Sequence, residues 1–518
     1  MSEPRKSWLS IAVLVLLLLV LAALRPLSVP DEGRYADIGR WMLVSGDWFT
    51  PRLNGIPFFH KPPYLHWLEA SAMAVLGVHA WSVRWVVALH AAMMLIVSYL
   101  AMRHIATEKI ARNTVWMLGT SLSFLIGGQY VNHDMLVAAW ISAALWCFSL
   151  AFMHGDKPHA WLARAGFAAC AFGMLSKGLI GFALPGLVLL IWLLLTKQMR
   201  KVLHLPWASG LLIFCTIALP WFILAQMQYD HMLQYMFGTH NFSRYTSSTF
   251  NNIQPFWFYG VVLLVLFFPW IFFTAYQAVV RIKSAQNATQ FIAKPYEWLL
   301  WIWLLAIVGF FSIPSSKIVG YMLPVMPALA ALAALGWQQL FAHRLDQDKW
   351  FASLCGLALA IAVVANVAAA RLSEKNSAQD VAQHFACIAK ASDTLYAVGE
   401  FPYDFAFYAQ TSQPMVVVQD WPEVRKDVGD NWRRELFEGA DFDARAAQVL
   451  QTSDVLDLAA TQAHQWLVAP KERGVTGFAL VLRGKAWSLY QSHASGAASS
   501  SAESPKPAEH KGLPGCTH

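Results

Sequence analysis

The chain has 518 residues, of which 57% are hydrophobic and only 13% are charged, and its mean hydropathy is +0.43. These values exclude a soluble globular protein and indicate a polytopic membrane protein. The formal net charge of +7 comes largely from basic residues in alternate loops, so it does not argue for nucleic-acid binding.

Long apolar runs recur along most of the chain. A hydrocarbon core of about 30 Å needs roughly 20 helical residues per crossing, and we predict a mainly α-helical bundle of about 11 to 13 transmembrane helices. The range allows for short or broken helices and for the stretch 65–77. The first run is expected to be an uncleaved helix, because Leu24-Arg25-Pro26 is a poor cleavage site. The runs are 8–24, 81–102, 113–128, 135–153, 160–175, 179–196, 207–226, 256–280, 297–313, 318–341 and 350–370.

Basic residues fall in alternate loops, which predicts the orientation of the chain. Loops rich in Lys and Arg face the cytoplasm, so the N-terminus is expected there. The basic loops carry Arg5 and Lys6; Arg103, Lys109 and Arg112; Lys157 and Arg164; Lys197, Arg200 and Lys201; Arg281, Lys283 and Lys294; and Arg344 and Lys349. The loops predicted on the far side are 25–80, 129–134, 176–178, 227–255, 312–317 and everything after 370.

The first far-side loop opens with VPDEGRYADIGRWM (29–42), which is dense in charge. The Pro30-Asp31 pair predicts a helix start, with Asp31 able to cap the first turn. Tyr35, Ile38 and Met42 then share one face, as in a helix lying along the membrane surface. One interpretation is therefore a cap followed by a solvated face, and the other is that Asp31 is a functional acid.

Further charged residues recur on the same predicted side. Lys61 follows His60 and precedes two prolines, and it is either a snorkelling anchor or an anion ligand. Asp134 stands directly before an apolar run, where an acid is costly unless it is paired, bound to metal or facing a polar cavity. Lys317 and Tyr321 lie four residues apart and hence on one helical face. Arg244 lies in the outer loop 227–255.

This combination of acids and cations has a chemical interpretation. Lysine and arginine at a lipid boundary suit a phosphate that must be held and must then leave. Acids suit metal coordination, orientation of a sugar, or removal of a proton from an attacking hydroxyl. Together they favour cleavage of a sugar from a lipid phosphate outside the cytoplasm.

Several stretches resemble a known family. The chain is similar to the bacterial branch of the protein O-mannosyltransferase-like glycosyltransferases of the GT-C superfamily, which includes the lipid A aminoarabinose transferases. The similar stretches come in the family's order across residues 1–370. They are DEGRYADIGRWMLVSGDWFTPRLNGIPFFHKPPYLHW (31–67), HDM (133–135), SKGLIGFALPG (176–186), THNFSRY (239–245) and SKIVGYMLPVMPALA (316–330).

The resemblance implies an activity and a set of site residues. It implies transfer of a sugar from undecaprenyl phosphate at the periplasmic face of the bacterial inner membrane, with lipid A or another envelope glycan as the acceptor. Our mechanistic hypothesis is an inverting, single-displacement transfer. The implied catalytic residues are Asp31, Asp134 and Arg34; the carrier-phosphate ligands are Lys61, Arg244, Tyr321 and Lys317; and the substrate-positioning residues are Tyr35 and Glu32. The expected partners are membrane lipids, the donor lipid and the acceptor, with no nucleic acid.

One departure from the family bears on metal binding. Relatives carry an acid before the Lys-Pro pair, whereas this chain has His60. His60 and His133 are therefore candidate ligands of a divalent metal ion, beside Asp134. The alternative is that His60 forms a hydrogen bond with a loop carbonyl or a lipid headgroup, and metal dependence stays open at this point.

The segment after residue 370 differs in composition. Strands are predicted at 393–400, 414–420, 464–470 and 478–492, with helices at 376–390, 402–410, 432–438 and 443–452. We expect residues 1–370, with the loop 25–80, to form the transmembrane domain, residues 371–492 a small periplasmic α/β domain, and residues 493–518 a disordered tail. The α/β domain is either a lid or acceptor-docking module, or plain structural support.

Two other functions fit part of the pattern. The enzyme could transfer a hexose or mannose to protein or to another surface glycan. Alternatively, the chain could transport lipid-linked sugars. Transporters usually show internal repeats and ionisable groups near the middle of the membrane, whereas the charges here gather at one predicted surface.

Overall fold

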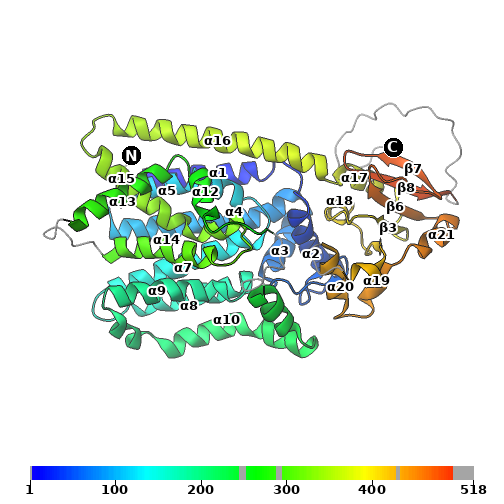
Figure 1. Cartoon of the computed structure of the whole chain (residues 1–518), viewed down its shortest axis with the longest axis horizontal. Coiled ribbons are helices and arrows are strands. Elements are labelled where there is room, and N and C mark those ends of the chain that lie inside the picture. Colours follow the sequence, from blue (N-terminus) through cyan, green and yellow to red (C-terminus); the bar gives the residue numbers. More distant parts are fainter. Residues whose placement is uncertain (1–2, 244–251, 287–294, 427–431, 494–518) are drawn as a thin grey trace. The chain divides into compact units, whose positions relative to one another are not determined.

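The computed structural model describes residues 3–243, 252–286, 295–426 and 432–493 (Figure 1). The chain forms two compact units, and each is described by itself. The membrane unit comprises Met1–Arg25, Asp47–Pro51 and Phe58–Arg371. The sheet unit comprises Pro26–Gly46, Arg52–Pro57 and Leu372–His518.

The membrane unit is a bundle of α-helices. Its helices are α1 (Glu3–Leu21), α3 (Tyr64–Leu76), α4 (Ala80–Ile105), α5 (Glu108–Gly119), α6 (Leu122–Gly127), α7 (His133–Met153), α8 (Ala160–Lys177), α9 (Ile180–Leu195), α10 (Trp207–Gln228), α12 (Phe258–Leu266), α13 (Ile271–Gln286), α14 (Pro295–Ser312), α15 (Met326–Phe341) and α16 (Gln347–Asn376). Three shorter helical segments are η1 (Met199–His204), η2 (Gln234–Ser243) and η3 (Val319–Val325).

The predicted apolar runs all form helices, which confirms a multi-pass membrane protein. In the described ranges, seven helices are long and apolar enough to cross a membrane, or eight if one bent pair counts as a single span. Four runs differ from simple spans. The run 160–175 forms α8, which is not among these seven helices. The run 113–128 is divided between α5 and α6, where the Ser121 side chain caps α6 through the Phe124 amide. The run 256–280 is α12 and α13, bent by 117°, and the run 179–196 is the short α9.

Helix α7 is buried within the bundle and positions the candidate site. It packs against α4, α8, α9 and η3. Most of its residues are buried, and aromatic contacts such as that between Trp146 and Trp303, with ring centroids 5.2 Å apart, fill the space around it. A polar residue at the N-terminus of α7 is therefore held by surrounding helices.

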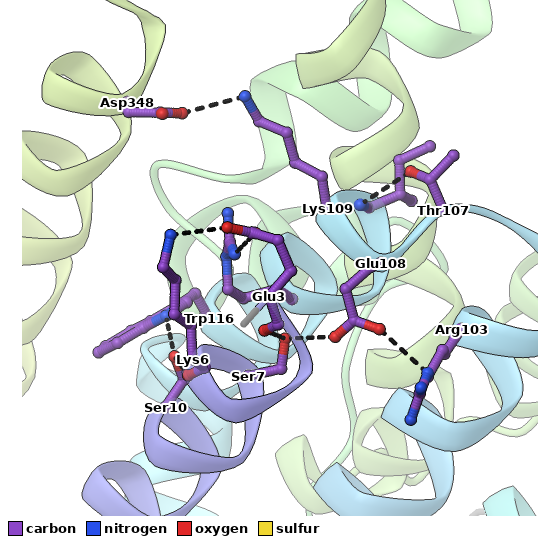
Figure 2. Close-up of polar contacts among 12 residues, drawn as sticks. Glu3, Lys6, Ser7, Ser10, Arg103, Thr107, Glu108, Lys109, Trp116 and Asp348 are labelled. Carbon is purple, nitrogen blue, oxygen red and sulfur yellow. Dashed lines mark hydrogen bonds and ion pairs between the residues drawn. The ribbon is translucent and has the colours of Figure 1, made fainter. Parts of the chain in front are cut away.

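Polar contacts join α1, α4, α5 and α16 at one end of the bundle (Figure 2). Glu108 accepts hydrogen bonds from Ser7 (2.6 Å) and Tyr99 (2.7 Å) and pairs with Arg103 at 3.0 Å. Lys109 pairs with Asp348 of α16 at 3.0 Å. These contacts fix the first helix against later ones at the end that we predict to be cytoplasmic.

The sheet unit is built around a six-stranded mixed sheet in the order β5-β4-β3-β6-β8-β7. The strands are β3 (Thr394–Val398), β4 (Val416–Val418), β5 (Leu450–Gln451), β6 (Gln465–Pro470), β7 (Phe478–Arg483) and β8 (Trp487–Ser492). Strands β3 to β6 pair in parallel, and β8 pairs antiparallel with β6 and β7. Its helices are α17 (Gln379–Ile388), α18 (Phe405–Ala409), α19 (Trp421–Val424), α20 (Trp432–Ala440) and α21 (Asp454–Thr461).

The predicted α/β organisation is confirmed, with two local corrections. The strand predicted at 478–492 is instead two antiparallel strands, β7 and β8. The helix predicted at 443–452 is instead a short turn, η4 (Ala446–Val449), followed by β5. The reason is that β5 pairs with β4 from elsewhere in the chain, and such pairing overrides local propensity. The predicted tail 493–518 lies outside the described residues after position 493.

The sheet unit also contains α2 (Asp31–Ser45) and the hairpin of β1 (Arg52–Leu53) and β2 (Ile56–Pro57), which we had expected within the transmembrane domain. Helix α2 packs against α18, and a Cβ on Gly33 would lie 3.0 Å from the Cβ of Asp404. A larger residue at this position would require Asp404 or its backbone to shift by a few tenths of an ångström.

The predicted helix at Asp31 is confirmed, but two details of the prediction are wrong. The N-cap is Pro30 rather than Asp31, and no side chain caps the helix. The charged residues do not form a solvated face either, because Glu32, Asp37 and Arg40 are all buried. Arg40 pairs with Asp37 at 2.6 Å, which compensates the burial of both charges.

Candidate functional site

The predicted site residues are divided between the two units. His60, Lys61, His133, Asp134, Lys317 and Tyr321 belong to the membrane unit. Asp31, Glu32, Arg34 and Tyr35 belong to the sheet unit. Arg244 lies outside the described residues. The two groups are therefore described separately.

Asp134 is held in the first turn of α7 by its neighbours. Asn132 is the N-cap, and its side chain accepts a hydrogen bond from the Asp134 amide at 2.9 Å. The same side chain donates to Asp134 Oδ2 at 3.1 Å. Lys177, in the last turn of α8, forms an ion pair with Asp134 Oδ1. The acid that sequence reasoning singled out is thus largely buried and compensated by a lysine.

Tyr321 completes this cluster from η3. The Lys177 Nζ lies 4.7 Å from the centroid of the Tyr321 ring, in a cation–π contact. The ring also stacks on Phe311. The backbone of η3 comes very near to Asp134, because a Cβ added to Gly320 would lie 2.2 Å from Asp134 Oδ2. Asp134, Lys177 and Tyr321 form what we call the anion cluster.

Lys61 lies in the same region as this cluster. Both Lys61 and Lys177 interact electrostatically with His133. The Lys61 ammonium donates to the carbonyl of His60 at 3.0 Å. His133 Nδ1 is 2.8 Å from the Ser176 carbonyl oxygen. Lys177 from the end of α8 and Lys61 from the loop before α3 therefore both act on His133, the first residue of α7.

The histidines do not fit the predicted metal site. His60 Nε2 is 2.8 Å from the Tyr235 hydroxyl, and its ring stacks on Phe58 at 4.7 Å. Within the described ranges, no group of three or more His, Cys, Asp or Glu side chains is arranged to hold a metal ion. The alternative role for His60 is a hydrogen bond with a loop carbonyl or a lipid headgroup, whereas the structure pairs its Nε2 with the Tyr235 hydroxyl of η2.

Lys317 is engaged by the backbone. Its ammonium donates to the carbonyls of Gln254 (2.9 Å) and Pro314 (2.5 Å). The residue is only 4% exposed, and burial lowers the pKa of its ammonium. In this structure Lys317 joins two loops, and its predicted contact with a carrier phosphate stays a prediction.

In the sheet unit, Arg34 connects two acids. Its Nη2 donates to Asp31 Oδ1 at 2.5 Å, and its Nη1 donates to Glu435 of α20. The guanidinium lies 4.8 Å from the ring centroid of Tyr35 and 5.9 Å from that of Tyr403. Burial acts to lower the pKa of Arg34, but the nearby acids outweigh it and raise this pKa well above its usual value.

The acids of this second group differ in exposure. The Asp31 side chain is 41% exposed, whereas those of Arg34 and Glu435 are 12% exposed. Glu32 is fully buried and accepts a hydrogen bond from the Ser28 amide at 2.8 Å. Asp31 is therefore the acid of this group that can meet a substrate, and the predicted positioning role of Glu32 stays a prediction.

Sequence reasoning missed three residues of these groups. Lys177 was visible, since it stands in the far-side loop 176–178, but nothing in the sequence paired it with Asp134. Glu435 and Tyr403 gave no signal, because they meet Arg34 only through the folding of the C-terminal segment onto α2.

Known proteins share this architecture, and residues 9–236 match the dolichyl-phosphate-mannose-protein mannosyltransferase family. The chain superposes on ArnT from Cupriavidus metallidurans, solved bound to undecaprenyl phosphate, with a TM-score of 0.78 and 24% sequence identity. This alignment covers 95% of this chain and 99% of that chain. The protein therefore has the fold of ArnT, and its residues 9–236 are similar to the mannosyltransferase family.

Two curated relatives give a more particular likeness. The undecaprenyl phosphate-alpha-4-amino-4-deoxy-L-arabinose arabinosyl transferase of Shewanella sediminis is 30% identical over 352 residues, which are 65% of this chain and 62% of that protein. Its counterpart in Pectobacterium carotovorum is 29% identical over 367 residues, which are 68% and 64% of the two chains. The match thus spans less than two thirds of the length of these relatives.

Proposed function

We propose that this protein is a glycosyltransferase that moves an aminoarabinose-type sugar from undecaprenyl phosphate to lipid A. The anion cluster carries the proposal, because it places a lysine, an acid and a tyrosine where apolar helices end. The names of the curated relatives and the lipid in the ArnT complex support the choice of donor.

The cations of the membrane unit are suited to the leaving phosphate. The acceptor oxygen attacks the anomeric carbon on the face opposite the carrier. The bond from that carbon to the phosphate oxygen breaks, and its electron pair stays on the phosphate. Lys61, Lys177 and Tyr321 can stabilise this growing charge, at a few kcal/mol for each contact when water is excluded. Asp134 keeps Lys177 in place before the donor arrives.

Asp31 is the proposed acid on the acceptor side. A lipid A phosphate is already an anion and needs little deprotonation, so Asp31 then orients the acceptor. With a hydroxyl acceptor, Asp31 is the general base. Its side chain is exposed enough to meet a substrate.

We place the protein in the bacterial inner membrane. The N-terminus is proposed to be cytoplasmic and the sheet unit periplasmic, since the basic loops alternate with the loops that carry the site residues. A periplasmic site is consistent with a lipid-linked donor in place of a nucleotide sugar.

A second candidate is transfer of mannose or another hexose to protein or to a different surface glycan. The matched family, whose described members act on proteins with dolichyl-phosphate-mannose, favours it. The acceptor distinguishes the two candidates, while the role of the anion cluster is the same in both.

The test is transfer by membranes of a deletion strain that carry this protein, given undecaprenyl-phosphate aminoarabinose and lipid A and analysed by mass spectrometry. Asp134→Asn should lose roughly 100-fold or more in rate, as expected for removal of a group that organises charge stabilisation. Asp348→Asn is the matched control, because Asp348 also pairs with a lysine but lies in the distant contact group of Figure 2.

Two results would contradict this proposal. One is a wild-type protein that is present in the membrane yet adds no mass to lipid A, which would move the search to proteins and other glycans. The other is an Asp134→Asn variant as active as Asp348→Asn, which would remove the anion cluster from the mechanism.

A further inference from the structure

We propose that Glu435 is a positioning residue for Asp31 and acts through Arg34. This inference rests on the proposed function, in which Asp31 orients or deprotonates the acceptor. It adds a residue of the C-terminal segment to the catalytic machinery of the sheet unit.

The first observation is how Arg34 is shared. One terminal nitrogen, Nη2, donates to Asp31, and the other, Nη1, donates to Glu435. A guanidinium is a planar fork that would otherwise bind one carboxylate through two parallel hydrogen bonds. Because Glu435 occupies Nη1, Arg34 offers Asp31 a single terminal nitrogen.

The second observation is that the guanidinium is fixed on its faces and edges. The rings of Tyr35 and Tyr403 lie within cation–π distance of it. The Arg34 side chain is 12% exposed, so water does not compete strongly for its donors. Arg34 therefore has little freedom to turn while Glu435 is present.

The third observation is that the position of Glu435 is itself fixed. Helix α20 carries Glu435 and packs on the hairpin of β1 and β2. A Cβ on Gly439 would lie 2.3 Å from the Pro57 carbonyl oxygen and 2.9 Å from Ile56 Cγ2. One turn of helix separates this close contact from Glu435, so the hairpin holds the acid at its place.

The consequence concerns the carboxylate of Asp31. Two acids share one cation, and Asp31 is the more exposed of the two. If Glu435 loses its charge, the fork of Arg34 is free to turn and engage both oxygens of Asp31. The carboxylate would then be withdrawn from the acceptor, which slows the transfer step without removing any group that binds the donor.

The experiment compares Glu435→Gln with Glu438→Gln in the full-length protein. Glu438 is the matched control, since it lies on the same helix and pairs with Arg434 at 2.6 Å instead of with Arg34. We expect kcat of Glu435→Gln to fall about tenfold with KM unchanged within about twofold, as for a loss felt in the transition state alone. Glu438→Gln should keep the wild-type kcat.

A double-mutant cycle distinguishes action of Glu435 through Arg34 from a purely structural role of Glu435. If Glu435 acts through Arg34, then Arg34→Gln combined with Glu435→Gln should lose no more than about twofold beyond Arg34→Gln alone. Independent roles would instead multiply the two losses. Glu435→Asp keeps the charge and should recover part of kcat, and it replaces Glu435→Gln in the comparison if the latter does not fold.

The outcomes separate this inference from the proposed function. Equal kcat for Glu435→Gln and Glu438→Gln in an active series contradicts the inference alone. A raised KM with unchanged kcat also contradicts it, because it assigns Glu435 to substrate binding. A series in which even the wild type transfers no sugar contradicts the proposed function and this inference with it.

Discussion

Asp404 has the clearest pH-dependent consequence among the single residues. It is fully buried in the sheet unit. Its carboxylate accepts hydrogen bonds from the Ser377 hydroxyl (2.5 Å) and from the Ala378 amide (3.2 Å). These contacts favour the charged form, but burial outweighs them and raises the pKa of Asp404 to about 6.

The first prediction at this scale concerns stability and pH. A carboxyl whose pKa is raised on folding takes up a proton, so its favourable contribution is present at low pH and is lost as pH rises through about 6. A shift of about two pKa units corresponds to about 3 kcal/mol at most. We expect the wild-type Tm to fall as the pH rises from the unfolded pKa of 3.8 through the folded pKa of about 6, and that of Asp404→Asn to change less, measured on the purified full-length protein.

Another acid of the sheet unit, whose pKa shifts in the opposite direction, serves as the control. Burial acts to raise the pKa of Asp443, but the hydrogen bond and charge of Arg52, together with hydrogen bonds from the Ala446 and Arg445 amides, outweigh it and lower this pKa. Asp443→Asn should therefore cost stability at neutral pH and cost less as the pH falls toward 3. Parallel Tm profiles for the wild type and Asp404→Asn would show that Asp404 does not titrate in this range.

A single residue could be predicted from the sequence where its charge is energetically costly at a membrane boundary. Asp134 and Lys61 were singled out because charges at a membrane boundary need a reason, and the structure gives each of them a charged or polar neighbourhood. Their identification from sequence was possible for that reason. Glu435 was not predictable, because 401 residues separate it from Arg34 and neither local pattern nor charge spacing reports such a contact.

At the scale of elements, the approach of η3 to α7 gives a sharp prediction. Gly320→Ala would place a Cβ 2.2 Å from Asp134 Oδ2, so the carboxylate or the η3 backbone must move. We expect transfer to fall at least about tenfold, since displacement of a catalytic constellation by about 1 Å can cost roughly 100-fold. The measurement is kcat, with Tm to verify folding.

Gly309→Ala is the control for this change. Gly309 lies within α14, and a Cβ there would meet no atom within 4 Å. Alanine is favoured over glycine in a helix by about 1 kcal/mol, so this variant should keep full activity and should not lower Tm. Equal activity of the two variants would mean that Asp134 tolerates displacement.

Elements were predicted well where local pattern decides them. The apolar runs form helices because a helix satisfies every backbone polar group within its own segment, as a bilayer requires. Helix α2 was predicted at the right place, but the prediction of a solvated face was wrong. Its charged residues are buried against partners such as the Thr411 carbonyl, which accepts a hydrogen bond from Arg40 at 2.7 Å. Strand β5 was missed for the same reason, because its pairing partner β4 is distant in sequence.

At the scale of the whole molecule, the orientation in the membrane is the main prediction. Single cysteines at Lys157 and at Lys485, in a background lacking the free cysteines, should react differently with an impermeant thiol reagent. We expect the cysteine at 485 to be labelled in intact spheroplasts. The cysteine at 157 should be labelled only after lysis, because the basic loop between α7 and α8 is predicted to face the cytoplasm. Labelling of 157 in intact cells would invert the proposed topology.

The division of the chain into two units could not be read from the sequence. Composition changes near residue 370, which located the C-terminal domain. However, Pro26–Gly46 and Arg52–Pro57 also cluster with that domain. Contacts such as that between the Asn54 side chain and the Met415 carbonyl, at 2.8 Å, depend on tertiary structure that no periodicity encodes.

The origin of the sheet unit from both ends of the chain sets an order for biosynthesis. Helix α2 leaves the ribosome roughly 360 residues before α18, against which it packs. At about 5–20 residues per second, this delay is on the order of tens of seconds. During that time Asp37 and Arg40 lack the surroundings that bury them, so the charged helix stays unpacked until the segment that begins at Leu372 has been synthesised. A nonsense mutation after the last membrane helix would therefore leave an early segment, with Asp31 and Arg34 on it, permanently without its fold.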